Sequence, residues 1–158
     1  MFYIEPCVLK YPNGCIQYYV NEYSFNSTPI LPSMPAIMIQ NLNITFDFQS
    51  KSANDIWGYH NYKLWKEVEL KEPNSVKGKL LLSLEIEYDD VYSIKRANEW
   101  ETYYNSQTGW ICIGDLNTQK YDAFIDKFNG CVEFYPNVIA AIKNGECNAI
   151  WIRPIVIK

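Results

Sequence analysis

The sequence predicts an α+β domain, a mostly antiparallel β-sheet with one or two packed helices. Residues 61–70 and 79–88 alternate apolar and polar side chains, which is typical of antiparallel strands with one buried face. Asn13-Gly14 and Asn144-Gly145 each separate two β-rich runs, and this pair of residues favours tight hairpin turns. Residues 89–104 repeat aromatic and charged side chains every three or four positions, which indicates a helix.

The first half of the chain is predicted to form hairpins and one irregular loop. Residues 2–20 should form a hairpin that turns at Tyr11–Gly14. Residues 21–35 should be a loop, since three prolines within seven residues remove backbone donors. Two short strands, 36–40 and 43–48, follow with a tight connection, and the alternating segments 61–70 and 79–88 then pair as a further hairpin.

The second half combines two helices with the strongest strand signals. Asp89 or Asp90 could cap the helix over 89–104. Tyr121, Phe124, Ile125 and Phe128 keep helical spacing within a short helix over 117–128. The expected strands are 110–115, 131–134, 137–142 and 147–157, with a turn at 143–146. No linker or repeat interrupts residues 1–158, so we expect a single domain.

Charge and hydropathy exclude two classes of partner. The formal charge is −4, and the longest basic element is the pair Lys95-Arg96, so we expect no nucleic-acid binding. No stretch approaches the roughly 18 apolar residues of a membrane-spanning helix, and the first residues lack a signal peptide pattern. We therefore expect a cytoplasmic protein with no membrane partner.

Five widely spaced cysteines make a poor disulfide framework, and we expect them to be reduced, with most serving as small apolar side chains. No glycine-rich phosphate loop occurs, and His60 is the single histidine. His60 could be a general base or a metal ligand, or a loop histidine with an ordinary role; the lack of nearby ligand spacing favours the latter. We predict no cofactor, no metal site and no catalytic residues.

The predicted hairpin would place several carboxylates and one tryptophan together on its solvent-exposed face. The residues of this predicted binding face are Trp65, Glu67, Glu69, Glu85, Glu87, Asp89 and Asp90. Such a face could attract a cationic protein partner, or it could serve solubility alone.

Carbohydrate chemistry is the alternative. Glu85 and Glu87 would lie about 7 Å apart, a spacing found in glycosidase acid/base pairs. A carbohydrate-binding module would instead use exposed Trp57, Trp65 or Trp100 as stacking platforms.

The C-terminal third carries the one resemblance to a known family. The segments that carry this resemblance are Gly109-Trp110-Ile111-Cys112-Ile113-Gly114-Asp115, Val132-Glu133-Phe134, Asn137-Val138-Ile139-Ala140, Asn144-Gly145-Glu146 and Ala149-Ile150-Trp151-Ile152-Arg153-Pro154. These segments resemble small bacterial immunity proteins of contact-dependent or polymorphic toxin systems. The resemblance covers about fifty residues and implies a small acidic protein that binds and neutralises a cognate, basic protein toxin.

Overall fold

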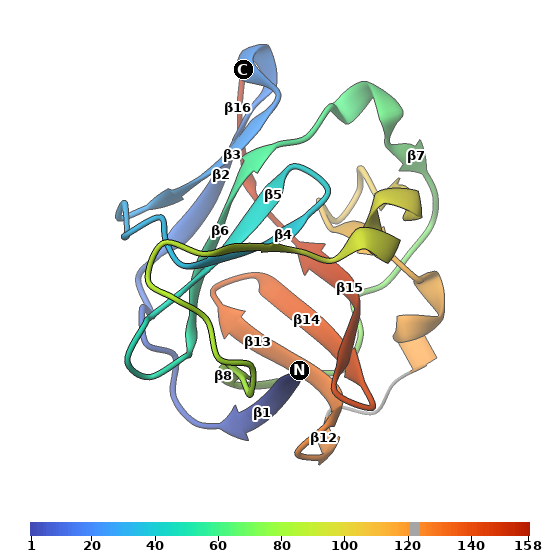
Figure 1. The fold of residues 1–158 in the computed structure, drawn as a ribbon. Coiled ribbons are helices and arrows are strands. Elements are labelled where there is room, and N and C mark those ends of the chain that lie inside the picture. The colour runs from blue at the N-terminus through green and yellow to red at the C-terminus, as the bar shows by residue number, and fades with distance from the viewer. Residues whose placement is uncertain (121–123) are drawn as a thin grey trace.

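The computed structural model describes residues 1–120 and 124–158 and contains two β-sheets that enclose one apolar core (Figure 1). The strands are β1 (Phe2–Pro6), β2 (Cys15–Tyr19), β3 (Ser24–Thr28), β4 (Ala36–Ile39), β5 (Leu42–Phe46), β6 (Ala53–Tyr59), β7 (Lys66–Glu67), β8 (Val76–Leu82), β9 (Val91–Ser93), β10 (Thr102–Tyr104), β11 (Ile111–Gly114), β12 (Phe124–Asp126), β13 (Asn129–Tyr135), β14 (Val138–Lys143), β15 (Glu146–Ile152) and β16 (Ile155–Ile157). Four 3₁₀ turns are the helical segments of the described residues: η1 (Val20–Glu22), η2 (Tyr62–Leu64), η3 (Lys95–Glu99) and η4 (Leu116–Lys120).

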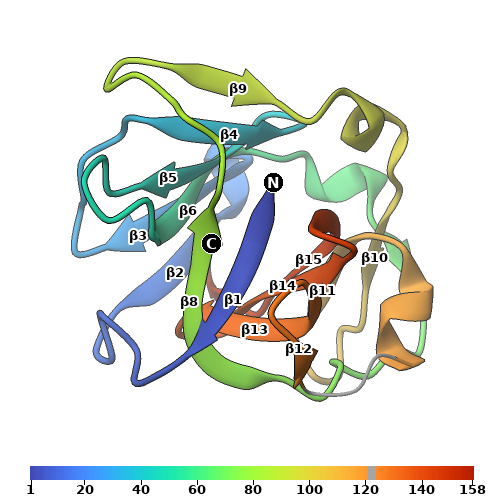
Figure 2. The same ribbon diagram turned by 60° about the horizontal axis from the view of Figure 1, so that its bottom comes forward.

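Both sheets are mixed. The nine-stranded sheet runs β1-β8-β13-β14-β15-β11-β10-β7, with β12 paired to β13. The seven-stranded sheet runs β16-β2-β3-β6-β5-β4-β9. Four of the pairings are parallel: β13 with β8, β10 with β7, β16 with β2 and β4 with β9. Figure 2 shows β4 and β9 opposite β13, β14 and β15, with the N-terminus between them.

The predicted α+β class is therefore wrong. Strands hold 50% of the residues and helical turns 9%, and no helix in the described part of the chain reaches seven residues. The core forms without helices because the nine-stranded sheet has apolar side chains packed on both of its faces. Val138, Ala140 and Ile142 face the inter-sheet core, whereas Ile139 and Ala141 face a second apolar cluster on the outer side.

The outer cluster explains the continuous apolar runs of the C-terminal third. Its fully or nearly buried members are Leu70, Trp110, Cys112, Cys131, Ile139, Ala141, Ala149 and Trp151. A strand covered on both faces needs apolar side chains at successive positions rather than at alternate ones. The Trp151 indole N–H finds a buried acceptor in the Thr118 hydroxyl at 2.9 Å, on η4.

The short hairpins are confirmed. Strands β4 and β5 pair from Ala36↔Thr45 to Ile39↔Leu42, close to the predicted 36–40 and 43–48. Strands β13, β14 and β15 form the predicted meander, with the turn at Asn144-Gly145. The buried strand predicted at 110–115 is β11.

The predicted hairpin over residues 2–20 is wrong, although its turn exists. Gly14 N–H donates to the Tyr11 carbonyl at 3.1 Å. Strand β1 pairs with β8, however, and β2 pairs with β3 and β16, so the two strands belong to different sheets. A turn signal describes local backbone geometry and does not determine which strand lies alongside.

The hairpin predicted from 61–70 and 79–88 does not form either. The first segment contains η2 and the two-residue edge strand β7, and β7 pairs with β10 at the far end of the sheet from β8. The second segment leaves the sheet after Leu82, which ends β8.

Both predicted helices are wrong. Residues 89–104 form β9, the single turn η3 and β10, and only Ala97 of η3 is buried. Pairing with β4 and with β11 satisfies this backbone instead. Residues 117–128 include part of η4 and strand β12, while 121–123 lie outside the described residues.

Two further segments differ from expectation. The predicted loop 21–35 contains η1 and strand β3, so only residues 29–35 are irregular. The predicted strand 147–157 breaks at Arg153-Pro154, since β15 lies in the nine-stranded sheet and β16 in the other.

Candidate functional site

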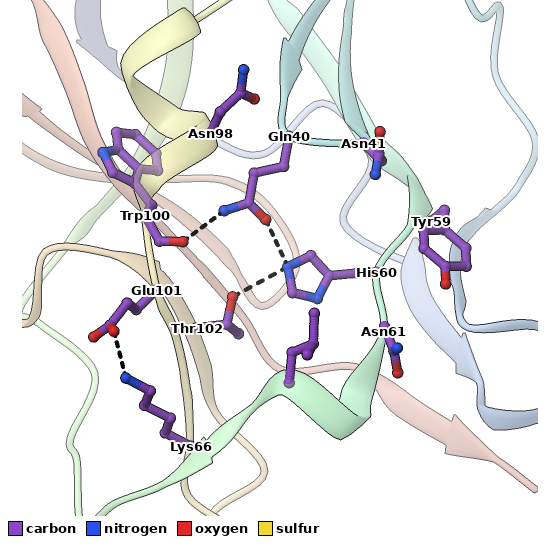
Figure 3. Close-up of a pocket in the computed structure, with 11 residues that line it drawn as sticks. Gln40, Asn41, Tyr59, His60, Asn61, Lys66, Asn98, Trp100, Glu101 and Thr102 are labelled. Atoms are coloured by element: carbon purple, nitrogen blue, oxygen red, sulfur yellow. Dashed lines mark hydrogen bonds and ion pairs between the residues drawn. The ribbon is translucent and has the colours of Figure 1, made fainter.

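A cavity of about 410 Å³ opens where the ends of the two sheets meet (Figure 3). Its lining comes from the β4–β5 turn, the end of β6, η2 and β7, and the segment from η3 to β10. The lining residues are Gln40, Asn41, Tyr59, His60, Asn61, Leu64, Lys66, Asn98, Trp100, Glu101 and Thr102. In Figure 3, Asn41, Tyr59 and Asn61 lie on one side of the His60 ring, and Asn98, Trp100 and Glu101 on the other.

The His60 ring forms the floor of this cavity and is held by hydrogen bonds at both nitrogens. The Trp65 indole N–H, which can only donate, lies 2.8 Å from His60 Nδ1. His60 Nδ1 is therefore the acceptor, and the neutral ring carries its proton on Nε2. Nε2 lies 3.1 Å from Gln40 Oε1 and 3.2 Å from the Thr102 hydroxyl (Figure 3).

The Gln40 amide confirms this tautomer. Its nitrogen donates to the carbonyl oxygens of Ala97 at 3.1 Å and Trp100 at 2.9 Å, so its oxygen must face His60. Gln40 reaches this position from a two-residue turn, where its φ is 57°. Gly58 on β6 permits the turn to lie close, because a Cβ there would collide with the Asn41 carbonyl oxygen.

Burial lowers the pKa of His60 to about 4 from its ordinary value of 6.5. The ring is only 6% exposed and stays neutral at physiological pH. His60 Nδ1 already accepts a hydrogen bond, and Nε2 already carries a proton. The ring is therefore poorly placed to act as a general base. The geometry gives His60 a structural role, in which it joins β6 to the segment around β7 and β10.

Among the described residues, no group of three or more His, Cys, Asp and Glu side chains is arranged to hold a metal ion. The thiols of Cys112, Cys131 and Cys147 are buried, and burial raises the pKa of each. These cysteines pack as apolar side chains, which agrees with their expected role.

The structure separates the predicted binding face into two parts. The first part lies on and beside β7 and consists of Trp65, Glu67 and Glu69. Trp65 is half-buried and packs on the rings of Tyr18 and Tyr104, with centroids 4.9 and 5.4 Å away. It is therefore a core side chain rather than the exposed anchor that the alternating pattern suggested.

Glu67 and Glu69 are exposed. Glu67 accepts hydrogen bonds from the Ser106 hydroxyl at 2.6 Å and the Ser106 N–H at 3.0 Å, which lower the pKa of its carboxyl. Glu67 thus ties the β7 edge to the loop after β10.

The second part of the predicted face lies on the loop that follows β8. Glu85, Glu87 and Asp89 are exposed, and Asp90 is half-buried. Glu85 forms an ion pair with Lys51 at 2.7 Å, and Asp90 Oδ2 accepts from the Glu87 N–H at 2.7 Å. The four carboxylates stay together because they share one short loop, and not because they share a strand face.

Tyr88 belongs to this loop, and two apolar side chains that the sequence did not connect with it, Met34 and Phe48, lie beside it. Tyr88 is 63% exposed and packs edge-on against Phe48, which is 43% exposed, with ring centroids 5.9 Å apart. Both rings and Met34 line a hollow of about 250 Å³. We call these side chains and the four carboxylates the acidic-aromatic surface: Met34, Phe48, Tyr88, Glu85, Glu87, Asp89 and Asp90.

The protein also contains a buried carboxyl that the sequence did not indicate. Asp55 on β6 is 1% exposed and accepts hydrogen bonds from the hydroxyls of Ser27 on β3 and Thr45 on β5. Burial raises the pKa of Asp55. No short motif marks it, because its two donors come from strands that are neighbours only in the folded sheet.

Comparison with protein-family models, curated proteins and solved structures gives no match, so no relative bears on the choice between binding and catalysis. Within the described residues, no helix has the length and apolar character needed to cross a lipid bilayer.

Proposed function

We propose that this chain is a non-catalytic protein-binding domain that recognises a cationic protein partner through the acidic-aromatic surface. Its role would be that of an immunity protein, which neutralises a cognate toxin by direct binding. The observation that carries the proposal is Tyr88, an aromatic side chain left largely exposed among four carboxylates and over a hollow.

Exposed aromatic side chains are enriched among residues that dominate binding energy, and carboxylates around them steer a cationic partner. Among the described residues, Lys51 is the cation that forms an ion pair with this loop, and its ammonium pairs with Glu85. Glu87 and Asp89 remain available to a partner's Lys or Arg side chains. The hollow beside Tyr88 and Phe48 could receive one apolar side chain of the partner.

The immunity role rests on the resemblance of the C-terminal third. Most of the residues that carry it form β11, β13, β14 and β15, where they build the nine-stranded sheet. These residues therefore support a sheet similar to that of the immunity proteins. They do not indicate which residues would contact a toxin. Support for the contact surface comes from the exposed Tyr88 and its neighbouring carboxylates.

The probe for this proposal is the protein encoded beside the gene for this chain, since an immunity protein is expected next to its toxin. We expect a stable complex, and we expect co-expression to protect a bacterial host from that protein. Glu87→Lys with Asp89→Lys should slow association, with an effect that shrinks as salt rises. Tyr88→Ala should speed dissociation and cost about 2 kcal/mol or more.

Glu69→Lys is the matched control, because Glu69 is also an exposed carboxylate and lies on the other part of the predicted face. It should leave association unchanged. Absence of any complex with the neighbouring protein contradicts the immunity role. A complex weakened by Glu69→Lys but not by the loop variants would instead place the contact on the segment that follows β7.

The geometry supports a carbohydrate-active enzyme less well than it supports a protein-binding domain. Glu85 and Glu87 lie on an exposed loop, and among the described residues Glu101 is the one carboxylate that lines the cavity of Figure 3. A glycosidase of the usual kind needs two carboxyls facing one bond. Hydrolysis of a glycoside that Glu85→Gln with Glu87→Gln abolishes would establish the enzymatic alternative instead.

A further inference from the structure

Thr102 lines the cavity of Figure 3, and its hydroxyl hydrogen has no acceptor among the described residues. The Trp65 and Gln40 contacts place the His60 proton on Nε2, so His60 donates toward the Thr102 oxygen at 3.2 Å and cannot accept from it. No other described residue accepts the Thr102 hydrogen. Thr102 is only 6% exposed, so this donor is buried at the floor and faces the space that a ligand would fill.

The walls add hydrogen-bonding groups that the protein leaves uncommitted. The side-chain amides of Asn41 and Asn98 and the Tyr59 hydroxyl form no hydrogen bond with any residue in the described part of the chain. Asn61 uses its side-chain oxygen to accept from the Lys63 N–H at 3.0 Å, which leaves its NH₂ group free. Carboxamides both donate and accept, as sugar hydroxyls do.

The charge of the cavity is balanced. Lys66 and Glu101 pair with each other across its edge (Figure 3), and His60 is neutral. A charged ligand would therefore find no uncompensated opposite charge among the described lining residues. Tyr59 and Trp100 supply partly exposed aromatic rings, which suit the apolar C–H faces of a sugar ring.

From these three features, we propose that the cavity binds an uncharged, hydroxyl-rich ligand of the saccharide class, with Thr102 donating to a ligand oxygen. This site is separate from the acidic-aromatic surface and does not depend on the proposed protein-binding role. Its volume of about 410 Å³ lies within the usual range of small-molecule sites, about 300–1,000 Å³.

The floor of the site is preorganised. Trp65, His60 and Gln40 form a continuous chain of hydrogen bonds that ends on the backbone carbonyls of Ala97 and Trp100. A ligand that meets Thr102 therefore does not have to order these side chains. This lowers the entropic cost of binding.

The test is calorimetric titration of the full chain with glucose, galactose, N-acetylglucosamine and maltose at millimolar concentrations. We expect saturable binding of at least one of these sugars. Thr102→Val keeps the shape but removes the donor, and it should weaken that binding by roughly three- to tenfold, the equivalent of one hydrogen bond. Thr102→Ser keeps the hydroxyl and should retain most of the affinity.

Asn98→Ala, on the wall, should also weaken binding, whereas Asn13→Ala, on the exposed turn after β1, is the control and should not. The thermal midpoint of each variant separates loss of binding from loss of folding. The inference is overturned if none of the four sugars binds saturably. It is equally overturned if a sugar binds but Thr102→Val and Asn98→Ala leave its affinity unchanged.

Discussion

The stability of the fold should depend on pH through His60. The unfolded chain binds a proton at this side chain below its ordinary pKa of 6.5, whereas burial lowers the pKa in the folded chain to about 4. Between these two values the unfolded state binds more protons than the folded state. The neutral His60 therefore contributes its full share of stability above the pKa of the unfolded state. This contribution is lost as the pH falls towards the pKa of the folded state.

The size of this loss follows from the shift. One pKa unit corresponds to about 1.4 kcal/mol, so the full shift of His60 corresponds to roughly 3 kcal/mol. About 2 kcal/mol of this should be lost between about pH 7 and about pH 4.5. His60 is 6% exposed, so solvent screening does little to reduce the effect.

The assay is urea unfolding at several pH values, carried out on the wild-type chain and on His60→Gln. Glutamine does not titrate, and the carboxyl groups titrate in both proteins, so their contribution cancels in the difference. The wild-type free energy of unfolding should fall by about 2 kcal/mol more than that of the variant over this range. Equal pH dependence in the two proteins would refute the buried, neutral histidine.

Three further predictions concern the core. Trp65→Phe removes the donor to His60 Nδ1 and should lower the free energy of unfolding by about 1–3 kcal/mol, measured by urea unfolding. Gly114→Ala should destabilise by at least about 2 kcal/mol, because φ is +130° and a Cβ would collide with the neighbouring β15 backbone; a thermal midpoint equal to that of wild type would contradict this. A thiol reagent should label no more than two of the five cysteines in the folded chain and all five in denaturant, since three are buried and burial raises their pKa. The protected thiols are Cys112, Cys131 and Cys147.

Local sequence predicted the short-range parts of the fold well. The β4–β5 hairpin and the β13–β14–β15 meander join neighbouring strands through tight turns, so turn residues and apolar runs contain most of the information. The same signals failed where pairing is long-range. Strand β1 pairs with β8, more than seventy residues away, and no turn residue can indicate that partner.

The helices predicted at 89–104 and 117–128 failed for a related reason. Spacing of three and four residues marks a helix only when that face is buried, yet Tyr92 is exposed and pairs through its backbone with β4. The open edges of existing strands offered hydrogen bonds that outweighed a modest helix preference.

The predicted binding face shows the same division. The cluster Glu85, Glu87, Asp89 and Asp90 stays together in the structure because the residues are close in sequence. Its combination with Trp65 depended on a hairpin that does not form. Phe48 and Met34 reach this cluster only through tertiary packing, and no sequence pattern connected them to it.

Local sequence is enough to predict the β-rich core, the tight turns, the burial of most cysteines and the concentration of carboxylates in one segment. Only the tertiary structure decided that Trp65 turns inward, that His60 is neutral and buried, and that Thr102 faces a cavity. These properties depend on which distant segments meet, because burial and the available hydrogen-bond partners set the protonation and exposure of a side chain. The alternation of residues along one strand specifies a face, but the neighbouring strands decide whether that face meets water or core.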